Sequence, residues 1–205
     1  MQDNDKTTTP EQPDTFEVVE AEHRTGARHK GVYLLPNLFT TGALFAGFYA
    51  IVAAMNGLFE HAAIGIIVAG ILDGLDGGVA RLTNTQSKFG AEYDSLSDCV
   101  AFGVAPGLVA YSWGLSELGK FGWMAAFIYV ACAALRLARF NVQAESTDKR
   151  FFIGLPSPTG AGLVATLVWL GASRGIDGNE ISWVVALVVA GEEALIGAFS
   201  LHIEA

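Results

Sequence analysis

Long apolar runs separated by short polar segments dominate the hydropathy pattern of this chain. Each run approaches the roughly 20 residues that an α-helix needs to cross the hydrocarbon core of a bilayer. A hydrophobic content of 52% and a mean hydropathy of +0.41 fit the same interpretation. The sequence therefore predicts an all-α integral membrane bundle of six transmembrane helices, at about residues 37–55, 59–82, 91–113, 118–140, 156–172 and 181–201.

The first 30 residues differ from the rest because they mix Thr, Pro, Asp and Glu with few apolar side chains. This composition predicts a disordered polar segment, and it has neither the apolar core nor the cleavage signature of a signal peptide. The segment ends in a basic cluster typical of an anchor at the cytosolic interface: Arg24, Arg28, His29 and Lys30. We therefore expect two parts, this segment over residues 1–30 and a six-helix transmembrane domain over residues 31–205.

Basic residues are divided unevenly between the two sets of loops. One side of the predicted membrane carries Lys120 and Arg174, and the other carries Lys6, Arg24, Arg28, Lys30, Arg81, Lys88, Arg136, Arg139, Lys149 and Arg150. Because cytosolic loops are enriched in Lys and Arg, this distribution predicts that both termini lie in the cytosol. The same orientation puts the loop between the second and third runs at the cytosolic surface.

Four aspartates interrupt the apolar runs on either side of that loop. Asp73 and Asp76 lie near the end of the second run, and Asp94 and Asp98 lie at the beginning of the third. Helical periodicity places each pair on one face of its helix, so the two pairs should point at one another. Carboxylates this close repel strongly at low dielectric, so we expect a cation among them. A divalent metal is the simplest candidate, since Mg²⁺ and Mn²⁺ prefer oxygen ligands.

The carboxylate cluster allows three interpretations. In the first, Arg81 and Lys88 neutralise the acids in a structural ion-pair cluster, although four acids against two bases leave excess charge where burial is costly. In the second, the acids mark a cation transport path, although such sites more often lie near the membrane midplane. In the third, the cluster is a two-metal phosphoryl-transfer site, in which Arg81 binds a phosphate oxygen.

At these residues the chain resembles the CDP-alcohol phosphotransferase family. The family signature is Asp-x2-Asp-Gly-x2-Ala-Arg-x8-Gly-x3-Asp-x3-Asp, and every fixed position is met between Asp73 and Asp98. The resemblance implies that the four aspartates bind two divalent cations, Mg²⁺ or Mn²⁺, and that Asp98 is also the general base. It further implies that the 31–205 domain is catalytic, that the protein is a homodimer, and that the CDP moiety is contacted by Gly77, Arg81, Ser87, Asn37 and Thr40. For Asn37 a plain helix N-cap is an equally good interpretation.

Two later segments resemble the phosphatidylserine synthase branch of that family: Arg136–Asn141 and Phe152–Pro158. The resemblance covers about residues 31–173 and implies that the substrates are CDP-diacylglycerol and L-serine, at the cytosolic face of a bacterial inner membrane. Arg136 or Arg139 can then bind the carboxylate of serine. Both arginines could instead be interface anchors. Phosphatidylglycerophosphate synthesis is the alternative activity, since glycerol 3-phosphate also needs basic residues here.

The remaining features change this interpretation little. A formal net charge of −9 argues against nucleic acid as a partner. We expect Trp113 and Trp123 to be belt aromatics at the non-cytosolic interface and Pro106 to kink the third helix. Glu192 and Glu193 interrupt the last apolar run, and the sequence assigns them no role.

Overall fold

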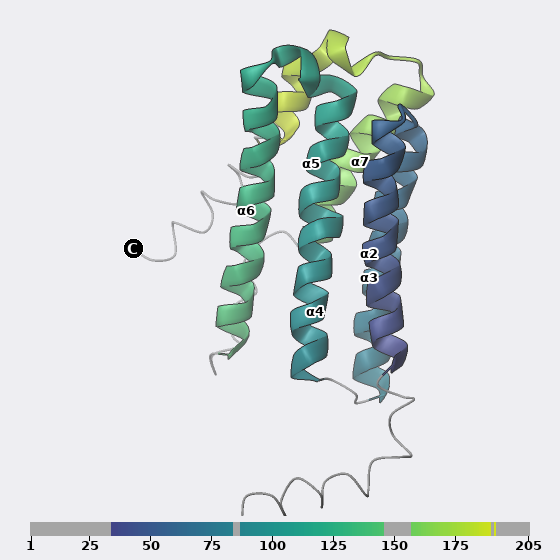
Figure 1. Ribbon diagram of the computed structural model, residues 1–205, viewed down its shortest axis with the longest axis vertical. Coiled ribbons are helices and arrows are strands. Elements are labelled where there is room, and N and C mark those ends of the chain that lie inside the picture. Colours follow the sequence, from purple (N-terminus) through teal and green to yellow (C-terminus); the bar gives the residue numbers. More distant parts are fainter. Residues whose placement is uncertain (1–33, 84–86, 146–156, 190, 192–205) are drawn as a thin grey trace, which may run out of the picture.

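The computed structural model describes residues 34–83, 87–145, 157–189 and 191, and every regular element in these ranges is helical. Its long α-helices run roughly parallel to the long axis of the bundle (Figure 1). In chain order the elements are α2 (Leu34–Met55), α3 (Phe59–Thr83), α4 (Lys88–Asp98), the π-helix η1 (Cys99–Val104), α5 (Ala105–Ala110), the π-helix η2 (Tyr111–Leu115), the 3₁₀-helix η3 (Ser116–Leu118), α6 (Lys120–Glu145), α7 (Ser157–Ser173) and the 3₁₀-helix η4 (Gly178–Ile181).

Four of the predicted spans are confirmed as helices long and apolar enough to cross a membrane: Asn37–Met55, Phe59–Val79, Phe89–Leu118 and Lys120–Val142. The fifth corresponds to α7, which has 17 residues. The sixth begins as a shorter apolar helix, Gly178–Val189. The predicted positions of Glu192, Glu193 and both termini fall outside the described residues. The count of six spans and the orientation therefore stay predictions.

The third span is one column built from α4, η1, α5 and η2 (Figure 1). Pro106 lies at the start of α5 and has no backbone N–H to donate within the helix. The column is π-helical before α5, over η1, and again after it, over η2. The structure thus shows changes of helix type along this column, and the kink at Pro106 stays a prediction.

Small residues bring α2 against its neighbours. A Cβ atom at Gly65 of α3 would lie 3.1 Å from the carbonyl oxygen of Ala46, and one at Gly47 would lie 2.7 Å from Cα of Ala101. Inside a bilayer, helices associate largely through such close backbone packing. Ala46 and Gly47 therefore bring α2 into close contact with α3 and with the third span within the bundle.

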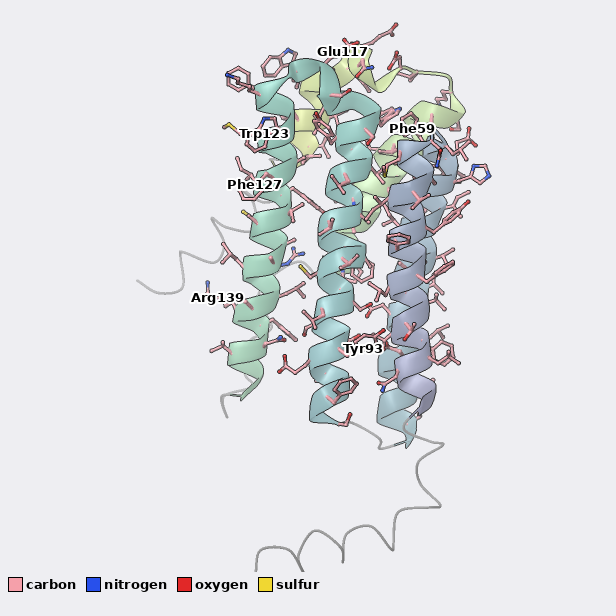
Figure 2. The ribbon with its side chains drawn as sticks, viewed as in Figure 1. Phe59, Tyr93, Glu117, Trp123, Phe127 and Arg139 are labelled. Atoms are coloured by element: carbon pink, nitrogen blue, oxygen red, sulfur yellow. The ribbon has the colours of Figure 1, made fainter. Side chains whose placement is uncertain are left out.

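The end of the bundle remote from the aspartates is closed by Trp113. This side chain is only 3% exposed, and a Cβ atom at either Gly171 or Gly178 would overlap it. The prediction that Trp113 is an interfacial belt residue is therefore wrong, because two glycines later in the chain make a pocket for its ring. Trp123 does lie on the outer side of α6, together with Phe127 (Figure 2).

Candidate metal centre

The carboxylates of α3 and α4 converge at one end of the bundle. Oxygen atoms of Asp73, Asp76 and Asp94 all lie within 4.8 Å of one another. The fourth carboxyl group, that of Asp98, lies within hydrogen-bonding reach of Asp73, and Asp94 is similarly placed against Asp76. The predicted meeting of the two pairs is confirmed, because α3 ends and α4 begins at the same end of the bundle (Figure 1).

The donor set fits a divalent metal. Asp76 is 5% exposed and the other three aspartates are half-buried, so water screens their mutual repulsion poorly. No described basic side chain forms an ion pair with them, the side chains of Arg81 and Lys88 being outside the described set. Several carboxylate oxygens within a few ångströms match the preference of Mg²⁺ and Mn²⁺ for hard oxygen ligands. The cluster is consistent with divalent-metal binding.

Asp76 is held in place by a buried hydroxyl on α2. Thr40 Oγ1 donates a hydrogen bond to Asp76 Oδ2, and Thr40 is 4% exposed. The backbone of Thr40 is tied to the same centre, because Ser97 Oγ donates to the Thr40 carbonyl oxygen at 3.1 Å. Metal-binding carboxylates are commonly oriented by such outer partners. Ser97 was not among the predicted site residues, and its only signal in the sequence is its position next to Asp98.

Two predicted CDP contacts, Asn37 and Ser87, lie close together beside the start of α4. Ser87 Oγ accepts a hydrogen bond from the Gly90 N–H at 2.9 Å and so caps the helix. A Cβ atom at Gly90 would be 3.0 Å from Ser87 Oγ and 3.5 Å from Asn37 Oδ1. The interpretation of Asn37 as a plain helix N-cap is wrong, because α2 begins three residues earlier, at Leu34.

The glycines of α3 beside the aspartates have open surroundings. Cβ atoms built on Gly74, Gly77 and Gly78 would meet no described atom within 4 Å. Each glycine costs a helix about 1 kcal/mol relative to alanine, so three in five residues are a considerable expense. Packing against described residues does not account for it. The open face leaves space that a ligand would fill.

The two arginines predicted to bind serine differ in environment. Arg136 is half-buried, and among the described residues its Nε and Nη1 atoms have no hydrogen-bond partner although both are shielded from solvent. Arg139 is exposed on the outer side of α6 (Figure 2). An unpartnered buried guanidinium is costly unless a ligand completes it, so Arg136 is the better candidate for a substrate contact.

A comparison with protein families decides what kind of protein contains this centre. The family model for CDP-alcohol phosphatidyltransferase matches residues 33–199. The chain belongs to that family. The family match covers both aspartate-bearing helices and α6, so the converging carboxylates and Arg136 fall inside the shared domain.

Curated relatives carry one name. The chain is 48% identical over 159 residues to a CDP-diacylglycerol–serine O-phosphatidyltransferase of Helicobacter pylori, covering 77% of this chain and 67% of that one. It is 39% identical to a protein of that name from Mycobacterium tuberculosis, over 83% of this chain and 61% of the relative. A third, from Bacillus subtilis, is 38% identical over 60% of this chain and 69% of its own. The matched region thus spans about two thirds of each relative's length.

Proposed function

We propose that this protein transfers the phosphatidyl group of CDP-diacylglycerol to the hydroxyl of L-serine and releases CMP. The observation that carries the proposal is the convergence of four carboxylates at the end of the bundle where α3 and α4 meet. Family membership and the names of the relatives support the choice of donor and acceptor. In the reaction, a bond forms between the serine oxygen and the phosphorus bearing diacylglycerol. The bond from that phosphorus to the oxygen of CMP breaks.

Asp73, Asp76, Asp94 and Asp98 would hold two divalent cations, Mg²⁺ or Mn²⁺. When bound, these ions neutralise the pyrophosphate and stabilise negative charge on the attacking and leaving oxygens. The carboxylates of α3 and α4 determine where the cations would bind. Thr40 orients the Asp76 carboxylate toward that position. Asp98 takes the proton of the serine hydroxyl as the oxygen attacks.

The CDP moiety lies along the open face of α3. Gly77 leaves room for it there, and Arg81, on the next turn of the same helix, binds a phosphate oxygen. Asn37 and Ser87, adjacent to one another near Gly90, contact the nucleotide. Thr40, the fifth predicted contact, donates to Asp76 and therefore contributes mainly by orienting that ligand.

Arg136 binds the carboxylate of serine. Its buried Nε and Nη1 atoms, unpartnered among the described residues, support this role, because the oxygens of a carboxylate are acceptors for a buried guanidinium donor. Arg139 is exposed and serves as an interface anchor, which was the alternative for both arginines. The active site faces the cytosol of a bacterial inner membrane, as the loop charges predict, and the protein works as a homodimer within the lipid bilayer.

The acceptor is tested by supplying L-serine, glycerol 3-phosphate and inositol separately to purified protein with CDP-diacylglycerol and Mg²⁺ or Mn²⁺. We expect phosphatidylserine and stoichiometric CMP with serine, and background levels with the other two alcohols. Mass spectrometry identifies the lipid. If phosphatidylglycerophosphate is the product, the acceptor is glycerol 3-phosphate and not serine, since Arg136 could equally bind a phosphate. Cation flux in liposomes without any lipid product would overturn the enzymatic assignment.

A further inference from the structure

The buried carbonyl oxygen of Phe102, in the π-helix η1, accepts a hydrogen bond from a side chain of α6. Tyr129 donates its hydroxyl to the Phe102 carbonyl oxygen at 3.1 Å. Both residues are about 1% exposed, so water does not replace this contact. Because an unsatisfied buried carbonyl is costly, the hydrogen bond from Tyr129 specifically links α6 to η1.

A second polar contact joins the same two columns nearer the aspartates. Asn141 Nδ2 donates to Ser95 Oγ at 2.9 Å, and the same hydroxyl lies 3.1 Å from Asn141 Oδ1. Toward this end α6 diverges from α4, whereas it packs closely on η1, α5 and η2 (Figure 1). The Asn141 side chain therefore bridges the two helices where their backbones have moved apart.

The two contacts bracket the proposed acceptor site. On α6, Arg136 lies between Tyr129 and Asn141, and on the third span Asp98 lies between Ser95 and Phe102. Tyr129, Ala133 and Arg136 follow an i, i+4, i+7 spacing and share one face of α6. Ala133 confirms where that face points, because a Cβ atom at Gly103 would be 3.4 Å from Ala133 Cβ.

We propose that Tyr129 and Asn141 are positioning residues that set the separation between Arg136 and Asp98, and with it the fit of the acceptor. This inference rests on the proposed function, because it takes serine as the molecule held between the two residues. Neither side chain needs to touch substrate. Each fastens α6 to the helix that carries the general base, one contact on either side of the acceptor.

The test is steady-state kinetics of Tyr129→Phe and Asn141→Ala with each substrate and the metal varied in turn. Loss of one hydrogen bond should lower kcat/KM for serine about three- to tenfold. The KM for CDP-diacylglycerol and the half-activating metal concentration should stay within about twofold, because their ligands lie on α2, α3 and α4. Tyr49→Phe is the matched control: it removes a hydroxyl from a side chain that is 42% exposed on α2, and its kinetics should be unchanged.

A double-mutant cycle separates positioning from general loosening. Ser95→Ala should reproduce the effect of Asn141→Ala, and the double variant should be no worse than either single one. Additive losses, or equal increases in KM for both substrates together with a lower melting temperature, would overturn the proposal. Wild-type protein that makes a different phospholipid would overturn the serine assignment alone, and the same variants would then be measured with the acceptor it uses.

Discussion

Glycine has opposite uses at the two ends of this bundle. Beside the aspartates, Gly74, Gly77 and Gly78 of α3 border open space. At the far end, Gly171 and Gly178 are pressed against Trp113, and a Cβ atom at Gly178 would lie 2.5 Å from the Trp113 carbonyl oxygen. The residue type is the same, but Trp113 fills the space beside the far-end glycines, whereas no described atom fills the space beside the α3 glycines.

The difference shows how to distinguish a packing glycine from one that serves a ligand. Both groups cost helix stability, since glycine is less favourable than alanine by about 0.5–1 kcal/mol within a helix. Close packing around Trp113 offsets that cost at the far end. Under the proposed function, substrate binding offsets the cost on the open face of α3. The two ends should therefore respond differently to substitution.

The largest effect is expected at the open end for Asp98→Asn. Removing a general base and metal ligand while keeping its shape should lower CMP release by about 10²–10⁴-fold. The matched control is Asp177→Asn, at the far end, where the side chain accepts from the Asn179 N–H at 3.0 Å and asparagine can do the same. Rates are measured by CMP release at saturating serine. Normal release by the Asp98 variant would refute its role as the base.

A methyl group at the closed end should affect folding and leave the chemistry intact. Gly171→Ala forces a Cβ atom into the ring of Trp113, and overpacking of this kind costs typically about 1–3 kcal/mol. The melting temperature in detergent should fall, with kcat of the remaining folded protein unchanged. Gly162→Ala on the same helix has open surroundings and should not be destabilising. Equal melting temperatures for the two variants would contradict the packing role.

An intermediate effect is expected at Thr40, which supports the metal centre through its hydrogen bond to Asp76. Thr40→Val keeps the volume of the side chain but removes the hydroxyl that orients Asp76. The metal concentration for half-maximal rate should rise about 10–100-fold. Thr166→Val is the control, because it removes a hydroxyl whose hydrogen bond, among the described residues, is to the Gly162 carbonyl oxygen of its own helix. If the metal concentration for half-maximal rate is unchanged in the Thr40 variant, Asp76 does not need this hydrogen bond to bind the metal.

The smallest change in stability is expected from filling the open face. Gly77→Ala should raise the free energy of unfolding by about 0.5–1 kcal/mol, because alanine is the better helix former and meets no neighbour. The same variant should bind CDP-diacylglycerol more weakly, which is seen as a higher KM. Gly162→Ala provides the comparison, with the gain in stability and no change in KM. A Gly77 variant with normal KM would mean that the space is not used by the donor.

The sequence predicted the elements and the centre well where the pattern is local. Apolar runs located α2, α3, the third span and α6, and the spacing of the aspartates predicted their convergence. Features that depend on distant neighbours were not predictable. The burial of Trp113 depends on Gly171 and Gly178, and the hydroxyl of Thr40 finds Asp76 only because α2 packs against α3. Pro106 indicated an irregularity but not its form, which is π-helical on both sides of α5.

All four carboxylates come from one hairpin, residues 73–98, whereas Arg136 comes from α6, a separate stretch of chain. Under the proposed reaction, the residues that act on the nucleotide bond and the residue that selects the alcohol thus lie on separate segments of the chain. Transplanting α6 from a relative with a different alcohol is then a direct way to redirect the product while the cation-binding hairpin is left untouched.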